Sequence, residues 1–252
     1  MGRALVFFLV QAPVALLLTA VCASASCLAA LGYRRGRTTR RIERAWGRAL
    51  LRLLRVDVCV SGLEHAPAGP AVYAANHASV IDILVVFGHL PVAFRIVYKR
   101  SLSLVPLLGW AIWLGGHVPI DRSHPFRARR GLDAAARRIR GGTSVVVFPE
   151  GTRSPDGAVG RFKRGSFSLA LQAGVPVVPV SLVGVKAVVP RGLPSVRPGL
   201  VRVVVHPVVP VEGRSADEVE ALAEDVRTIV ARGCGEGFAR GHEASRPGGL
   251  DA

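Results

Sequence analysis

Residues Ala71–Asp82 read AVYAANHASVID, an apolar run set directly against a cluster of polar side chains. The run Ala71–Ala75 is predicted to be a buried strand, because it is short, apolar and followed at once by turn residues. A helix is expected over Val80–Gly88, which leaves His77 in the turn between the two elements. Sites in open α/β sheets form beyond the carboxyl ends of strands, so this turn is the first place to look for chemistry.

Outward from this stretch, short β-branched runs alternate with helical stretches. The alternation predicts an α/β fold with a central, mostly parallel sheet flanked by helices. Ser215 and Glu218 have capping-box spacing before the last helix, and Gly233 is expected to end it, leaving residues 233–252 as a loose tail. The other strands are expected at Val56–Ser61, Ala93–Tyr98, Thr143–Phe148, Val177–Leu182 and Val201–His206, and the other helices at Phe126–Arg140, Gly165–Gln172 and Ala216–Arg232.

The chain opens with an apolar segment. From Ala4 to Leu31 it holds 28 residues without a charge, and about 20 are enough to cross a bilayer core. A cleaved signal peptide is the alternative, since residues 23–25 (ASA) resemble a cleavage site. Because positive flanks stay on the cytoplasmic side, residues 1–33 are predicted to be a transmembrane or membrane-anchoring helix, with the rest of the chain on the cytoplasmic face of the cell membrane.

Residues 34–55 are strongly basic. They carry nine arginines against one acid, Glu43, which accounts for half of the net charge of +16. Apolar residues recur at helical spacing opposite the arginines, so we expect a basic amphipathic helix on an anionic membrane surface. The alternative is a surface helix whose apolar stripe packs on the protein core. Nucleic-acid binding is not expected, because no aromatic stacking platform is interleaved with the charge.

The chain length, the cysteine count and the missing motifs exclude several classes of protein. A chain of 252 residues, half of them hydrophobic, is long enough for one packed domain and a small appendage. Four cysteines without CxxC or zinc-type spacing exclude a disulfide scaffold and suggest no metal site. The GxSxG, P-loop and HExxH signatures are absent.

A second uncharged stretch, Leu102–Leu114, is too short to span a membrane. It is either a buried helix or a patch that dips into the membrane interface.

The polar cluster around His77 suits acid–base chemistry. With His77 in the turn and Asp82 in the first turn of the helix, the two side chains can meet, although in one continuous helix they would point about 140° apart. A carboxylate on one imidazole nitrogen fixes the tautomer and makes the other nitrogen a base for a substrate hydroxyl. The alternative is structural, since Ser79 and Asp82 also have helix-capping spacing.

A second polar cluster follows another predicted strand. It reads FPEGTRS over residues 148–154. Gly151 permits a close backbone approach, and Thr152, Arg153 and nearby amides could form a concave anion site. Arg122 and Lys163 could add positive charge. The alternative is an ordinary hydrophilic loop.

Together, and in this order, the two clusters resemble the glycerolipid acyltransferases, specifically the 1-acyl-glycerol-3-phosphate (lysophosphatidate) acyltransferases. Two further blocks agree with the family's pattern. Residues Lys99–Arg122, which end in Asp-Arg, resemble its second motif, and Val175–Gly184 (VPVVPVSLVG) resembles its fourth. The match covers about Ala71–Gly184. The spacer between His77 and Asp82 lacks the aromatic residue often found there, which could alter the choice of acceptor.

The resemblance implies an acyltransferase domain over residues 56–232, acting on the free hydroxyl of lysophosphatidate to give phosphatidate. The donor would be acyl-CoA or acyl carrier protein, with no other cofactor and no metal. Another lyso-lipid as acceptor, a membrane-tethered basic adaptor and a lipid hydrolase are the alternatives. The resemblance implies that His77 is the general base and Asp82 its orienting partner. It implies that the acceptor phosphate is held by Glu150, Gly151, Thr152 and Arg153, with help from Arg122 and Lys163. It also implies that Pro179 shapes the acyl pocket.

Overall fold

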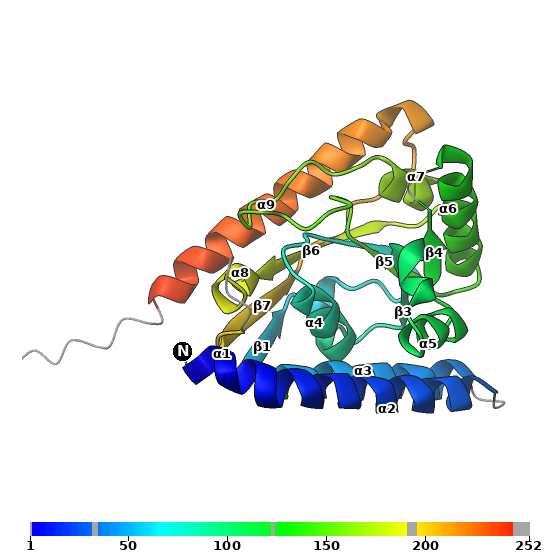
Figure 1. Cartoon of the computed structure of the whole chain (residues 1–252). Coiled ribbons are helices and arrows are strands. Elements are labelled where there is room, and N and C mark those ends of the chain that lie inside the picture. The colour runs from blue at the N-terminus through cyan, green and yellow to red at the C-terminus, as the bar shows by residue number, and fades with distance from the viewer. Residues whose placement is uncertain (1, 32–34, 122–123, 191–195, 244–252) are drawn as a thin grey trace, which may run out of the picture.

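The computed structural model describes residues 2–31, 35–121, 124–190 and 196–243. Within them a single sheet forms the centre, with the strand order β1-β7-β6-β2-β5-β3-β4. Helices cover both of its faces (Figure 1). One apolar core joins the sheet to α3 and α4, and a second core joins its other face to α6, α7 and α9. The predicted α/β fold is confirmed.

The strands lie close to their predicted positions. All neighbouring pairs are parallel except β6 and β7, which are antiparallel, so the sheet is mostly parallel as expected. The short strand β4 was not predicted, because its three residues are too few to show a pattern. The strands are β1 (Val56–Ser61), β2 (Val72–Ala75), β3 (Phe94–Lys99), β4 (Val118–Ile120), β5 (Ser144–Val147), β6 (Val177–Val183) and β7 (Gly199–Val205).

The predicted helices are also present. The capping box of Ser215 and Glu218 forms at the start of the last one, as expected. Three short 3-10 segments are η2 (Leu63–His65), η3 (Arg100–Leu104) and η4 (Ala216–Glu218). The other helical elements are α1 (Gly2–Val6), the π-helical turn η1 (Phe7–Gln11), α2 (Ala12–Leu31), α3 (Arg35–Leu53), α4 (Ile81–His89), α5 (Leu108–Leu114), α6 (Pro125–Arg140), α7 (Gly165–Ala173), α8 (Val185–Val188) and α9 (Val219–Glu243).

The prediction that Gly233 ends the last helix is wrong. Helix α9 continues to Glu243, so residues 233–243 are helical rather than a loose tail. A side chain at position 233 would place its Cβ 2.5 Å from the His206 ring and from Ser181 Oγ. The glycine therefore allows the helix to approach the sheet closely instead of stopping it. The remainder of the predicted tail, residues 244–252, lies outside the described residues.

Helix α3 packs on the domain through its apolar stripe. Leu50 and Leu51 are buried in the core, and a Cβ on Gly47 would lie 2.7 Å from the carbonyl oxygen of Leu84 in α4. The structure thus favours the second of the two predictions, in which the stripe faces protein rather than lipid. On its other side α3 lies along α2 (Figure 1), and Trp46 Nε1 donates a 3.0 Å hydrogen bond to Thr19 Oγ1.

Two apolar surfaces remain uncovered. The helical stretch Ala4–Ala30 spans 27 residues and is long and apolar enough to cross a membrane by length and composition. Its outer face exposes large side chains such as Leu16 and Leu28. The stretch Leu102–Leu114 forms η3 and α5, in which Trp110 and Trp113 are 57% and 64% exposed. It is therefore not a buried helix, and the prediction of a surface patch describes it better.

Candidate active site

The two polar clusters meet at the carboxyl-terminal ends of two neighbouring strands in the middle of the sheet. Strands β2 and β5 are parallel neighbours, with Ala74 opposite Val147, so the loops that follow them leave the sheet side by side. The backbone N–H of Ser154 donates a 2.7 Å hydrogen bond to the carbonyl oxygen of His77. The loop 148–154 and the turn around His77 thus form one surface, as the resemblance required.

The predicted contact between His77 and Asp82 is confirmed. His77 Nδ1 lies 2.8 Å from Asp82 Oδ2, and the carboxylate is fully buried. The same oxygen accepts hydrogen bonds from the backbone N–H groups of Ala78 (2.6 Å) and Ser79 (2.8 Å). Asp82 therefore both closes the turn and orients the imidazole, so the two alternatives do not exclude each other.

This contact fixes the tautomer of a neutral His77. A carboxylate can only accept, so Nδ1 carries the proton and Nε2 has the free lone pair. The side chain is 18% exposed, and Nε2 has no hydrogen-bond partner among the described residues. The ring also lies against Phe148, with centroids 4.4 Å apart, which restrains its orientation. A base held in this way can take a proton from a hydroxyl that reaches Nε2.

The Glu150 carboxyl, for which the resemblance implies a contact with the acceptor phosphate, accepts hydrogen bonds from the protein backbone on both of its oxygens. Its Oε1 accepts the backbone N–H of His77 at 2.8 Å, and its Oε2 accepts the N–H of Gly160 at 3.2 Å. Burial raises the pKa of the Glu150 carboxyl, while these two hydrogen bonds act in the opposite direction. A buried carboxylate would also repel a phosphate. Glu150 is therefore a positioning residue that ties the second loop to the backbone of His77.

The other predicted phosphate ligands surround Gly151. This glycine has φ +75°, a conformation that side chains rarely adopt, and a Cβ there would lie 2.8 Å from Lys163 Nζ. The Lys163 side chain thus crosses directly over the glycine, while Thr152 and Arg153 are exposed beside it. The structure brings Gly151, Thr152, Arg153 and Lys163 together on one surface. Arg122 lies outside the described residues.

Asn76 is a site residue whose role sequence reasoning missed. It was predicted at most to close a turn, but its buried side chain makes both amide hydrogen bonds to Leu182. Nδ2 donates to the Leu182 carbonyl oxygen at 3.0 Å, and Oδ1 accepts the Leu182 N–H at 2.7 Å. These bonds fix the end of β2 against β6, the strand that also contains buried Pro179. No cluster of three or more metal-ligand side chains occurs in the described part of the chain.

Comparison with known proteins assigns this arrangement to a family. A model of the acyltransferase family matches residues 57–183. The chain is 37% identical over 175 residues to a chloroplastic 1-acyl-sn-glycerol-3-phosphate acyltransferase of Arabidopsis thaliana, which covers 68% of this chain and 48% of the relative. It is 35% identical to the human 1-acyl-sn-glycerol-3-phosphate acyltransferase alpha over 200 residues, 77% of this chain and 71% of the relative.

The fold of one solved structure matches the fold of this protein over nearly the whole chain. The 1-acyl-sn-glycerophosphate acyltransferase PlsC of Thermotoga maritima superimposes with a TM-score of 0.78 at 29% identity, covering 94% of this chain and 98% of that one. The chain belongs to the acyltransferase family. Within that family it is similar to the 1-acyl-sn-glycerol-3-phosphate acyltransferases, although it spans about half the length of the two chloroplastic relatives and of the algal relative that it matches.

Proposed function

We propose that this protein moves a fatty acyl chain from acyl-CoA or acyl carrier protein to the free hydroxyl of lysophosphatidate, giving phosphatidate for phospholipid synthesis. The observation that carries the proposal is the geometry of His77. Its Nδ1 is held 2.8 Å from Asp82, its Nε2 has no hydrogen-bond partner among the described residues, and its backbone carbonyl accepts a hydrogen bond from Ser154 at the end of the 148–154 loop. The names of the relatives support the same acceptor.

His77 and Asp82 can support a direct transfer of the acyl group from the donor to the acceptor. Neutral His77 removes the proton of the acceptor hydroxyl at Nε2 as that oxygen attacks the thioester carbonyl. The C–O bond forms, the C–S bond breaks, and the leaving thiolate takes up the proton that His77 carried. Asp82 stabilises the transient imidazolium and keeps the ring in place. No acyl-enzyme intermediate is needed, and no metal takes part.

The acceptor phosphate would bind at Gly151–Arg153. Arg153 can engage a phosphate through two parallel N–H groups, and Lys163 adds a point charge. Gly151 has no side chain of its own, and Lys163 Nζ lies close to where its Cβ would be, so a phosphate at this turn would meet the lysine ammonium group. Holding the phosphate there places the neighbouring hydroxyl toward His77, and such positioning supplies much of the rate in a reaction between two bound substrates.

We place the protein at the cell membrane, with its catalytic domain on the cytoplasmic face. The exposed apolar face of α2 supports membrane association, as does the arginine-rich α3 beside it. If α2 crossed the full bilayer, it would carry the arginines of the adjoining α3 into hydrocarbon, which is costly. We therefore propose that the two helices lie along the membrane surface, with the apolar face of α2 toward the acyl chains.

Release of thiol from acyl-CoA, measured with and without lysophosphatidate, tests the proposal. We expect release to depend on the acceptor and to yield phosphatidate. The variant His77→Ala should lose at least about a hundredfold in rate without unfolding. Release without an acceptor would instead identify a hydrolase, and transfer only to other lyso-lipids would identify a different acceptor. Full activity of folded His77→Ala would refute the mechanism.

Arg153→Ala tests the phosphate site separately. We expect the KM for lysophosphatidate to rise at least about tenfold, because the variant loses the charge-assisted hydrogen bonds of the guanidinium to the phosphate, with little change in kcat. Arg129→Ala, an equally exposed arginine on α6, is the matched control and should leave KM unchanged. Equal effects of the two variants would show that only overall charge matters.

A further inference from the structure

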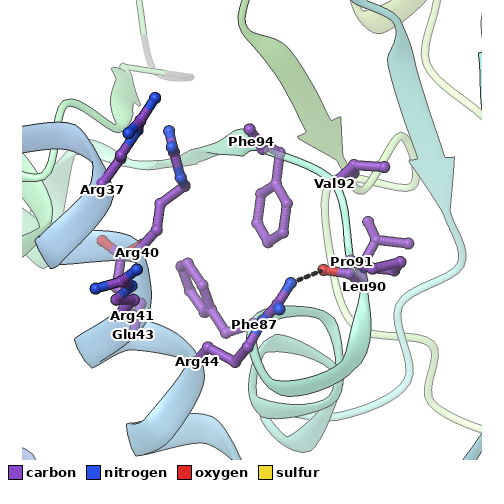
Figure 2. Close-up of a pocket in the computed structure, with 11 residues that line it drawn as sticks. Arg37, Arg40, Arg41, Glu43, Arg44, Phe87, Leu90, Pro91, Val92 and Phe94 are labelled. Atoms are coloured by element: carbon purple, nitrogen blue, oxygen red, sulfur yellow. Dashed lines mark hydrogen bonds between the residues drawn. The ribbon is translucent and has the colours of Figure 1, made fainter. Parts of the chain in front are cut away.

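A hollow of about 320 Å³ lies between α3 and the segment that joins α4 to β3. Figure 2 shows the arginines of α3 on one side of it, the Phe94 ring across from them and the Phe87 ring between. The rings belong to Phe87 and Phe94, which are buried and lie 5.5 Å apart between centroids. The side formed by α3 presents four arginines: Arg37, Arg40, Arg41 and Arg44.

The four arginines that line this pocket outnumber its one lining carboxylate, Glu43. None of the four arginines Arg37, Arg40, Arg41 and Arg44 lies within 4.0 Å of a carboxylate oxygen of the described residues. Glu43 also lines the pocket, but its Oε1 is 3.0 Å from His117 Nε2, which donates to it. Arg44 Nη2 is held in place by a 3.2 Å hydrogen bond to the carbonyl oxygen of Leu90. Preplaced guanidinium groups in excess of carboxylates are suited to an anion.

This pocket is separate from the candidate active site. It adjoins the C-terminal end of α4, whereas Asp82 lies in the first turn of that helix. Phe87 and Leu90, which line the pocket, follow Asp82 by five and eight residues, a rise of about 7–12 Å along the helix, and His77 lies before the first residue of that helix. In lysophosphatidate the phosphate is only a few bonds from the reacting hydroxyl. An acceptor whose hydroxyl reaches His77 therefore cannot place its phosphate in this pocket.

The surroundings of the pocket are those of a membrane surface. Leu28, near the end of α2 that leads into α3, is 70% exposed. At the end of α5, a Cβ on Gly115 would lie 3.0 Å from Glu43 Oε1, so α5 with its exposed Trp110 and Trp113 reaches this region. Tryptophans beside arginines are typical of the level of lipid headgroups.

We propose that this pocket binds the phosphate headgroup of an anionic phospholipid, as a second lipid site apart from the catalytic centre. Guanidinium groups of α3 bind the phosphate oxygens, and the glycerol portion lies against Phe87 and Phe94. A lipid held there fixes the edge of the domain between α3 and α4 to the membrane. The proposal does not depend on the reaction that the protein catalyses.

Calorimetric titration of the full chain in an uncharged maltoside detergent tests the proposal, with dihexanoyl phosphatidylglycerol as the probe. Arg40→Gln should weaken binding about tenfold. Ala93→Trp, at an exposed position lining the pocket, fills the space without changing charge and should weaken binding as well. Arg129→Gln on α6 removes the same charge elsewhere and should have no effect. Arg153→Ala should also keep the affinity, because it lies at the acceptor site.

Several outcomes would overturn the assignment. Equal losses in Arg40→Gln and Arg129→Gln, with Ala93→Trp unchanged, would mean that the lipid is attracted only by diffuse surface charge. Equal binding of dihexanoyl phosphatidylcholine, or no binding by the unmodified protein, would exclude a site for anionic headgroups. A further outcome is displacement of the bound lipid by inorganic phosphate or coenzyme A at concentrations similar to that of the lipid itself. Such displacement would assign the pocket to the free ion or to the donor nucleotide instead of a lipid.

Discussion

Two histidine–carboxylate pairs in this molecule look alike but differ at the second ring nitrogen. His77 Nδ1 lies 2.8 Å from Asp82, and His117 Nε2 lies 3.0 Å from Glu43. In the second pair the remaining nitrogen, Nδ1, accepts the backbone N–H of Ile96 at 2.9 Å. In the first pair the remaining nitrogen has no described partner. His77 is therefore available as a base, while His117 connects α3 to β3 and has no lone pair left for a substrate.

The difference is one of position rather than residue type. His77 stands in a turn at the end of a strand, where its outer edge is partly exposed. His117 is buried beside the Phe87 ring, with ring centroids 5.4 Å apart, and backbone groups surround it. A histidine paired with a carboxylate is thus evidence for catalysis only when its other nitrogen can reach a ligand. The same change made in both pairs should accordingly have different consequences.

Asp82→Asn should have the largest effect, on activity. The amide can still accept the N–H groups of Ala78 and Ser79, but it no longer stabilises an imidazolium, so kcat should fall about 10²–10⁴-fold with little change in KM. The downfield proton NMR signal of the Nδ1–H of His77 should weaken or vanish. Glu43→Gln makes the same change in the other pair and should leave kcat within about twofold. Equal losses of kcat would remove the distinction between the pairs.

His117→Leu should act on stability instead. It leaves the N–H of Ile96 and the carboxylate of Glu43 without their partner, which should cost about 2–5 kcal/mol in the free energy of unfolding. Urea unfolding followed by tryptophan fluorescence measures this loss. Activity per folded molecule should be retained, since the pair lies away from His77. A variant as stable as the original but inactive would assign His117 to the chemistry.

A third histidine should show a smaller, pH-dependent effect. His206 Nε2 lies 2.8 Å from Ser181 Oγ, and burial, together with nearby His65, lowers the pKa of His206. The unfolded chain then binds a proton at higher pH than the folded chain does. Stability should therefore be complete above the ordinary histidine pKa of about 6.5 and decline as the pH falls from there through the lowered value.

The non-titrating variant His206→Gln isolates this contribution. Its free energy of unfolding should depend less steeply on pH below about 6.5 than that of the original protein. Thermal unfolding between neutral and mildly acidic pH measures both slopes. Identical slopes would show that protonation of His206 does not contribute to acid sensitivity.

How well each feature could be predicted depended on the sequence distance between its parts. The pair of His77 and Asp82 is separated by five positions, so helix and turn geometry were enough to bring it together. The pairs Glu150–His77 and Glu43–His117 are separated by 73 and 74 positions, and no local pattern indicated them. The resemblance alone implied a phosphate contact for Glu150, and its hydrogen bond to the backbone of His77 could be found only in the structure.

By itself the sequence determined the alternation of strands and helices, the apolar N-terminal segment, the arginine-rich segment after it, and the two polar loops that carry the chemistry. These follow from periodicity and local turn geometry, which act over a few residues. Only the tertiary structure decided that the apolar stripe of α3 faces protein, that Gly233 lies inside a helix, and that His117 is enclosed while His77 remains open. Those outcomes depend on which distant surfaces pack together, and packing is settled by the whole chain at once.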